Sequence, residues 1–519
     1  MVMTTIIRKY TFMRKYTLCA IAAFALSTAA CTKFKDINTN PETPETVKPA
    51  MLATRIILNL TNQPSTKSFM QPYILTKQIA WSELAEAYQF NGLGTMSMSL
   101  TSINDAHFMV KFANTEQLKN SYEGLMYFAR AMKFYDITMA LGDIPYKDAL
   151  QGETEKVYFP RYDLQKDVFL GILGELEKAD NLFSKGSKFE GDPIFGGDTQ
   201  KWRKVVNSFA LNVLIQLSKK ENEADLNLKA RFEAIVKSKP IFTSNADNLQ
   251  LIRTDKSGQV YPFHKISNSF VIYPMVSSEI IDRLQLQQDR RLFYYANPSP
   301  IKIKEGLAAS DFQAYIGVDP SLPFSDLAAI KISNDYAKLN DRYTELVTGE
   351  PTQIYGYQHL CFVIAEAAAR GWTTESALGW YKKGIEASMK FIASNTPAED
   401  IYNHGMPLDN AYIEAALARY EQAFPTAKEP QIDAIITQKY LASFLQATIT
   451  PFYDYRRTGY PNWKINAASS MNADAPDKMP LRWRYPAVEF NYNAEHVNEA
   501  IERQYQGVDD VNKIMWLLK

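Results

Sequence analysis

Cysteine is scarce in this chain, with three residues among 519. Cys19 and Cys31 both lie in the amino-terminal segment, within the first 31 residues. Cys361 lies in the apolar run Leu360-Cys361-Phe362-Val363-Ile364, which favours a small buried side chain over a reactive thiol. If Cys19 leaves with the signal and Cys31 carries lipid, no disulfide can form within the mature chain.

Neither sign of charge is in excess, because 57 Lys and Arg residues balance 57 Asp and Glu residues. Residues 1–30 hold Arg8, Lys9, Arg14 and Lys15 and no acid, so their removal would leave a mildly acidic chain. A nucleic-acid-binding protein is expected to carry a basic stripe. The composition therefore gives no support to a nucleic-acid partner.

Motifs of catalysis and metal binding are also missing. None of the five histidines begins a His-Glu-x-x-His motif. His496 and Glu499 could share a helix face, but no third ligand lies near them in the sequence. The chain has no Gly-x-Ser-x-Gly motif and no phosphate-binding loop, and Gly92-Leu93-Gly94 lacks the third glycine of a dinucleotide site. We therefore expect no catalytic residue, no metal, no cofactor and no enzymatic activity.

The amino-terminal segment has the three parts of a bacterial export signal. Arg14 and Lys15 precede an uncharged stretch from Thr17 to Ala30, which ends in two alanines before Cys31. A cysteine directly after such small residues is the acceptor position of a bacterial lipoprotein. We predict that residues 1–30 are a lipoprotein signal peptide and that Cys31 is the lipid attachment site. The alternatives are a plain secretory signal or a transmembrane helix, although the stretch is short of the roughly 20 residues that cross a bilayer.

Residues 31–50 follow with three prolines, Pro41, Pro44 and Pro49, among several Asn and Thr residues. Proline restricts both itself and the preceding residue to extended conformations. This segment is predicted to be a semi-stiff tether between the lipid and a globular body.

Further along, apolar residues recur at the helical spacing of three and four. The clearest segment runs from Tyr122 to Leu141 and stops before Gly142. The next begins after Pro160, with Asp163 as the expected N-cap. Other segments with this spacing are 200–218, 357–370, 374–392 and 432–447. Because helices arrive in pairs with short turns, we predict an all-α fold of tetratricopeptide-like helical pairs, although no regular repeat length is evident.

The middle of the chain, about residues 240–355, is rich in Pro, Gly, Asn and Tyr and has only short apolar runs. This composition predicts a loop-rich insertion with small helices and a hairpin.

Two adjacent arginines, Arg456 and Arg457, lie beside Asp454 and several aromatic residues. Glu366 lies inside an apolar helical segment, where a buried acid needs a partner. Buried guanidinium groups need carboxylate partners for the same reason. We predict that at least one of these arginines is buried and paired with Glu366 or Asp454.

Aromatic residues are abundant, with 30 Tyr, 28 Phe and 7 Trp, and they provide the candidate binding site. In the segment 81–91, Trp81 and Tyr88 are seven apart, which would place them on one helix face with Asn91. Such a platform of rings and an amide suits a sugar or a peptide. Tyr294, Tyr295 and Tyr315 from the insertion could form the opposite wall of a groove. The alternative, that these rings are core residues, stays open.

Several segments, taken in order, carry a family resemblance: Asp36-Ile37-Asn38-Thr39-Asn40-Pro41, Leu141-Gly142-Asp143-Ile144-Pro145-Tyr146, Phe195-Gly196-Gly197-Asp198, Ala365 to Trp372, Tyr455-Arg456-Arg457-Thr458-Gly459-Tyr460-Pro461, Pro480-Leu481-Arg482, and Tyr485-Pro486 with Glu489 and Asn493. The chain resembles the SusD/RagB-like outer-membrane lipoproteins of Bacteroidetes, in the SusD-like branch. One departure is Asn212, where the family pattern leads us to expect an arginine.

The resemblance implies an all-helical body over residues 51–519, anchored by lipid at the surface of the outer membrane. It also implies a SusC-like TonB-dependent outer-membrane transporter as partner, to which the protein delivers captured oligosaccharides or oligopeptides without chemistry of its own. We expect a glycan ligand ahead of a peptide. A surface hydrolase and a structural lid without ligand affinity are the competing hypotheses.

Overall fold

The structure is a computed structural model that describes residues 48–61, 67–446 and 449–519. The predicted signal peptide, Cys31 and most of the predicted tether lie outside these ranges. The first described helix, α3 (Pro49–Thr61), begins at a proline. Proline is tolerated at the first helical position because its missing N–H would have no helical partner there. The prediction that the tether extends to residue 50 is therefore wrong for Pro49 and Ala50, which are helical.

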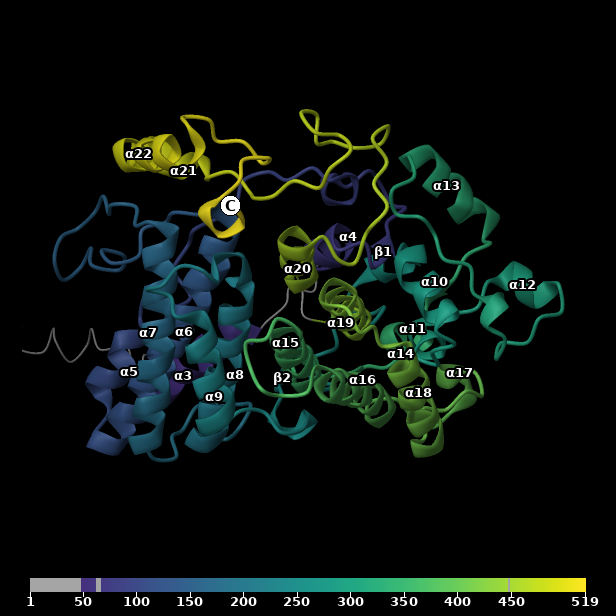
Figure 1. The fold of residues 1–519 in the computed structure, drawn as a ribbon, viewed down its shortest axis with the longest axis horizontal. Helices are drawn as coiled ribbons and strands as arrows, with labels where there is room; N and C mark the ends of the chain where they lie inside the picture. Colours follow the sequence, from purple (N-terminus) through teal and green to yellow (C-terminus); the bar gives the residue numbers. More distant parts are fainter. Residues whose placement is uncertain (1–47, 62–66, 447–448) are drawn as a thin grey trace, which may run out of the picture. The chain divides into compact units, whose positions relative to one another are not determined.

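Helices from the first half of the chain pack against one another in sequence order (Figure 1). They are α3, α5 (Ala106–Phe112), α6 (Glu116–Leu141), α7 (Gln165–Lys185), α8 (Thr199–Gln216) and α9 (Leu228–Ser238). The most extensive packing is between α6 and α7, and α7 in turn packs on α8. These consecutive pairs confirm the prediction of an all-α, tetratricopeptide-like fold.

A second group of helices comes from the second half of the chain. It contains α15 (Tyr357–Ala369), α16 (Ala377–Ser394), α17 (Asp400–Asn403), α18 (Asn410–Ala423), α19 (Lys428–Ala442) and α20 (Thr450–Thr458). Helix α15 packs against α16 and α19 on one side and against α8 on the other. It therefore joins the two groups of helices into one body.

Between these groups, β2 (Leu249–Leu251) pairs antiparallel with β6 (Thr352–Tyr355), with Leu249 opposite Tyr355. The chain between them forms short helices: α10 (Ser278–Leu286), α11 (Leu292–Tyr295), α12 (Pro300–Lys304), α13 (Phe324–Ser333) and α14 (Asp341–Thr344). It also supplies β3 (Met275–Val276), β4 (Ala296–Asn297) and β5 (Lys338–Leu339) to a sheet of order β1-β3-β5-β4, in which β1 is Ile79–Ala80. The segment predicted as loop-rich, about residues 240–355, thus consists of short helices and strands. The β2–β6 pair brings its two ends together.

The remaining elements are short. They are α4 (Gln71–Leu75), α21 (Ala487–Tyr492), α22 (Ala494–Tyr505) and the 3-10 turns η2 (Lys67–Met70), η3 (Ala87–Phe90), η4 (Ser218–Lys220), η5 (Asn245–Asp247), η6 (Ser269–Ile272), η7 (Phe312–Ala314) and η8 (Trp516–Leu518). Helices α21 and α22 lie over one end of α6 and α7 (Figure 1). The Tyr505 hydroxyl donates to the Leu141 carbonyl over 2.6 Å, and Arg503 Nη2 contacts Asp143 Oδ2 at 2.6 Å.

The ends of α6 follow from its sequence. Thr115 caps the first turn, because its hydroxyl accepts a hydrogen bond from the Leu118 N–H at 3.2 Å. Gly142 ends the helix at φ 97°, and a Cβ there would overlap Gln504 and Tyr505. Asp163 is not the N-cap of α7, which corrects that prediction. Its Oδ2 instead accepts from the N–H groups of Tyr146 and Lys147 at 3.0 and 2.8 Å.

The core runs continuously through both groups of helices. Cys361 is buried in it, and burial raises the pKa of its thiol, which confirms the interpretation of a small core side chain. Within the described ranges, no helix is long and apolar enough to span a bilayer.

Candidate ligand-binding site

The predicted helical platform at residues 81–91 is not a helix. Trp81 follows strand β1, and Tyr88 lies in the 3-10 turn η3, which Asn91 ends in the left-handed conformation at φ 60°. The physical reason is strand pairing, because Ile79 and Ala80 pair with Val276 and Met275 of β3 and hold the chain extended. The prediction of a shared helix face is therefore wrong.

Trp81 is 0% exposed and packs against the rings of Phe270 and Tyr273, at centroid distances of 6.4 and 5.8 Å. Asn91 is also buried, and its Oδ1 accepts a hydrogen bond from Lys77 Nζ at 2.9 Å. The Tyr88 hydroxyl, partly buried, accepts from the Trp483 indole N–H at 3.2 Å. Trp81 and Asn91 therefore act in the packing of this region and present almost no surface to a ligand.

The predicted opposite wall is also internal, since Tyr294, Tyr295 and Tyr315 are 4%, 2% and 1% exposed. Each hydroxyl has an internal partner. Tyr294 accepts from the Leu408 N–H, while Tyr295 and Tyr315 donate to the carbonyls of Leu441 and Ala309. The expectation that these rings line an open groove is corrected, because tertiary packing places all three in the core.

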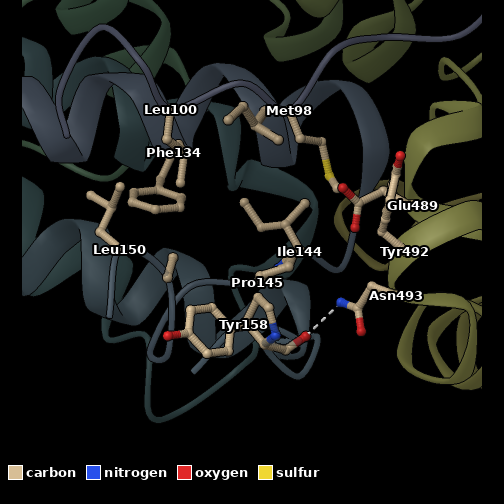
Figure 2. Close-up of a pocket in the computed structure, with 13 residues that line it drawn as sticks. Met98, Leu100, Phe134, Ile144, Pro145, Leu150, Tyr158, Glu489, Tyr492 and Asn493 are labelled. Atoms are coloured by element: carbon tan, nitrogen blue, oxygen red, sulfur yellow. Dashed lines mark hydrogen bonds between the residues drawn. The ribbon is translucent and has the colours of Figure 1, made fainter. Parts of the chain in front are cut away.

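An open cavity of about 200 Å³ lies elsewhere, between α6, the segments at 98–100 and 144–160, and α21 (Figure 2). Its apolar surface comes from Met98, Leu100 and Leu150, which are not buried, and beneath them lie the buried side chains of Phe134, Ile137 and Ile144. Two tyrosines at the cavity are largely exposed, Tyr158 at 66% and Tyr492 at 72%. The combination of an apolar base and exposed rings with polar hydroxyls is typical of a ligand site.

Polar groups fix the rim of this cavity. Glu489 Oε2 accepts a hydrogen bond from the Tyr162 hydroxyl at 2.8 Å, and burial together with this carboxylate raises the pKa of Tyr162. Asn493 Nδ2 donates to the Pro160 carbonyl at 2.8 Å, the dashed bond in Figure 2. Both bonds hold the segment at 158–162 against the carboxy-terminal helices and thereby position the exposed rings.

Two further hollows border the same part of the chain. One of about 590 Å³ shares Ala149 and Leu150 with the first cavity and has polar lining from Asn104, His107 and Lys147. The other, of about 410 Å³, is lined by Arg55, Asn59, Thr101, Ser102, Lys133 and Asp136. Each of the three hollows is lined by residues of the segment 98–107 and by residues of α6, so all three lie beside this helix.

No sequence motif pointed to Tyr158 or Tyr492. Tyr158 directly follows the mainly polar stretch 151–157 and precedes Phe159 and Pro160, a pattern that marks a loop with exposed rings. Phe490 and Tyr492 lie on α21, a helix without a fully buried residue. Aromatic residues after a polar stretch and in a short segment near the carboxy terminus were the available signal, but their meeting in space is not readable from the sequence.

Among the described residues, no three His, Cys, Asp or Glu side chains are grouped as they would be around a metal ion. His496 Nδ1 lies 3.4 Å from Glu499 Oε2, so this pair does share a helix face.

Comparison with protein families matches residues 41–486 to the SusD-like model described as "Starch-binding associating with outer membrane". The chain belongs to the SusD-like family. The resemblance seen in the sequence motifs is thereby confirmed. Comparison with curated proteins finds no match.

Solved structures agree with this membership. A SusD homolog from Bacteroides fragilis NCTC 9343 is 44% identical, covers 91% of this chain and 100% of its own, and superimposes with a TM-score of 0.88. An outer-membrane protein from Bacteroides vulgatus ATCC 8482, described as probably involved in nutrient binding, is 31% identical with the same coverage and a TM-score of 0.80. A chitin-binding SusD homolog from Flavobacterium johnsoniae is 18% identical over 91% of this chain and 98% of its own, with a TM-score of 0.69, and shares the fold.

Proposed function

We propose that this SusD-like protein captures oligosaccharides at the surface of the outer membrane and delivers them to a SusC-like TonB-dependent transporter. The observation that carries the proposal is the pair of exposed rings, Tyr158 and Tyr492, at an apolar cavity in a chain of this family. The starch-binding description of the family model and the chitin-binding relative support a glycan as ligand.

The cavity suits the chemistry of a sugar. A pyranose has apolar C–H faces and polar edges, so a tyrosine ring can cover the face while its hydroxyl bonds the edge. Glu489 adds a carboxylate at the cavity, and the neighbouring hollow adds His107, Lys147 and other hydrogen-bonding side chains. A ligand longer than one sugar could extend from the first cavity into the neighbouring hollow, because Ala149 and Leu150 line both.

Attachment through Cys31 would keep the protein at the membrane that holds the transporter. This part of the proposal is supported by the basic, apolar and small-residue pattern of residues 1–31 and by the family description, which refers to the outer membrane.

Oligopeptide capture is the second candidate, and the apolar base of the cavity favours it specifically. Met98, Leu100 and Leu150, apolar lining residues that are not buried, would accept an apolar side chain as readily as a sugar face.

The deciding experiment is binding of the purified mature protein to an array of neutral glycans and to a mixture of oligopeptides, with analysis of the products. We expect retention of intact glycans that falls when Tyr158 and Tyr492 are replaced by alanine. Ile332→Ala is the matched control, because this side chain is 85% exposed on α13 and lies outside the cavity. Retention of peptides alone would favour the second candidate. Cleaved products would show a hydrolase and overturn the proposal.

A further inference from the structure

The hollow of about 410 Å³ beside α6 holds hydrogen-bonding groups from three parts of the chain. Lys133 and Asp136 come from neighbouring turns of α6, Arg55 and Asn59 from α3, and Thr101 and Ser102 from the segment 98–107. Unlike the cavity with Tyr158 and Tyr492, this hollow has a mainly polar lining. Its residues are separate from those that the proposed function uses.

One cation of the hollow is already neutralised by the protein. Arg55 Nη1 pairs with Asp105 Oδ2, and its Nη2 donates to the Thr101 carbonyl at 3.1 Å. These two bonds also hold α3 to the segment 98–107. Arg55 therefore forms a wall of the hollow and contributes little free charge.

Asp136 has no such partner. Within the part of the chain that the structure describes, its carboxylate makes no hydrogen bond and no ion pair, although the side chain is half-buried. Lys133 and Ser102, which are also partly buried, and the exposed Asn59 likewise make no side-chain hydrogen bond among the described residues. Partly buried polar groups are normally satisfied by protein, water or ligand. The hollow thus contains one strong acceptor and several donors that are available to a bound molecule.

Charge and hydrogen-bonding capacity select the kind of molecule. Lys133 and Asp136 offset each other, so a ligand with net charge of either sign gains little. A carboxylate only accepts hydrogen bonds and an ammonium only donates them, whereas a hydroxyl does both. A neutral molecule with several adjacent hydroxyl groups could donate to Asp136 while accepting from Lys133, Asn59 and Ser102.

Burial raises the pKa of Asp136 to about 6, and Lys133 opposes this rise. The other titratable groups that face it are the phenols of Tyr135 and Tyr453, whose pKa values burial raises as well. The carboxylate is therefore ionised at neutral pH but poorly solvated. Donated hydrogen bonds from a ligand would compensate this loss of solvation.

We propose that this hollow is a second sugar subsite, in which Asp136 is the principal acceptor for the hydroxyl groups of a neutral saccharide unit. The inference rests on the proposed function. On α6, Phe134 and Ile137 line the aromatic cavity while Lys133 and Asp136 line this hollow, so the two subsites lie on adjoining faces of one helix.

The test is isothermal titration of the mature protein with maltoheptaose and with chitohexaose. Asp136→Asn should lower the affinity for the glycan that binds by about ten- to a hundredfold, because hydrogen bonds to a charged group are lost. Lys133→Gln should lower the affinity for the same glycan by a smaller factor. Asp474→Asn is the matched control, since Asp474 is exposed and lies outside the hollow, and it should bind like the parent.

Thermal unfolding of Asp136→Asn checks the fold, and we expect no loss of stability because no protein hydrogen bond is removed. Should it nonetheless unfold, Lys133→Gln decides the question alone. Parent-like binding by the folded Asp136 and Lys133 variants, while Tyr158→Ala and Tyr492→Ala weaken it, would overturn the subsite and leave the proposed function intact. Failure of the parent protein to bind either glycan or any member of the glycan array would overturn both.

Discussion

Arg457 and Glu366 form a two-pronged ion pair inside the protein, although 91 residues separate them in the sequence. Arg457 Nη1 donates to Glu366 Oε1, and Nη2 donates to Oε2 at 2.8 Å, with both side chains 1% exposed. Arg457 Nη2 also reaches Asp454 Oδ1 at 3.1 Å. The pair joins α15 to α20, and it confirms the prediction of a buried arginine with one of these carboxylates. Arg456 is buried too, but it donates to the carbonyls of Met139 and Leu481.

The first prediction concerns this ion pair. Arg457→Ala leaves Glu366 buried with Arg370 as its remaining partner, and loss of one member of a buried pair typically costs about 3 to 5 kcal/mol. Urea unfolding should show a free energy of unfolding lower by that amount. Lys390→Ala, which breaks the exposed pair with Glu386, is the control and should change it by less than about 1 kcal/mol. Equal effects of the two variants would contradict the structural role.

The second prediction is a pH dependence of stability at Asp136. Its folded-state pKa of about 6 is above the ordinary value of 3.8, so the folded protein holds this proton more tightly than the unfolded chain. The contribution to stability is fully present below about pH 3.8 and is lost as the pH rises through 6. Asp136→Asn should remove this loss, on the order of 1 to 2 kcal/mol. Unfolding free energies of parent and variant at pH 4 and 7.5 test it, and parallel pH profiles would contradict it.

The third prediction concerns Tyr158 and Tyr492. Removal of one stacking ring should weaken glycan binding by about 1 to 3 kcal/mol, using the magnitude known for ring stacking on nucleobases. Because both rings are largely exposed, the midpoint of thermal unfolding should stay close to that of the parent. Titration calorimetry and thermal unfolding of Tyr158→Ala and Tyr492→Ala provide both values. Unchanged affinity in both variants would place the glycan elsewhere.

The fourth prediction concerns Trp81, which is buried against Phe270 and Tyr273. Trp81→Ala should lower the free energy of unfolding by about 3 to 5 kcal/mol through loss of packing. Leu84→Ala, at a side chain 44% exposed in the same segment, should have an effect within about 0.5 kcal/mol. A stable Trp81→Ala protein with lost glycan binding would restore the role first predicted for this ring.

The fifth prediction is that Cys31 carries the lipid. Cys31→Ser should give a folded protein that no longer partitions with membranes, since each buried methylene of an acyl chain contributes about 0.8 kcal/mol. Cys19→Ser is the matched control, because Cys19 leaves with the signal peptide and its replacement should keep the membrane association. Fractionation in cells without the transporter separates lipid anchoring from retention by a partner. Membrane association of the Cys31 variant would contradict this prediction.

Local signals in the sequence determined much of the helical scaffold. The part of helix α6 from Tyr122 to Leu141 could be predicted because its apolar spacing and the terminal Gly142 act within a few residues of one another. The start of the helix at Glu116 and its Thr115 cap were not predicted. The pairing of Arg457 was predictable for a different reason, since a charge among apolar and aromatic residues requires an opposite charge wherever the fold supplies it.

Only the tertiary structure decided which aromatic residues face solvent. Trp81 and Tyr88 have helical spacing, but pairing of β1 with β3, almost 200 residues away, overrides it and buries Trp81. Tyr158 and Tyr492 meet at one cavity because the segment at Pro160 binds Asn493, 333 residues later. The exposure of a ring depends on what the rest of the chain packs against it. Such long-range contacts leave no periodic trace in the local sequence, so the scaffold could be predicted and the site could not.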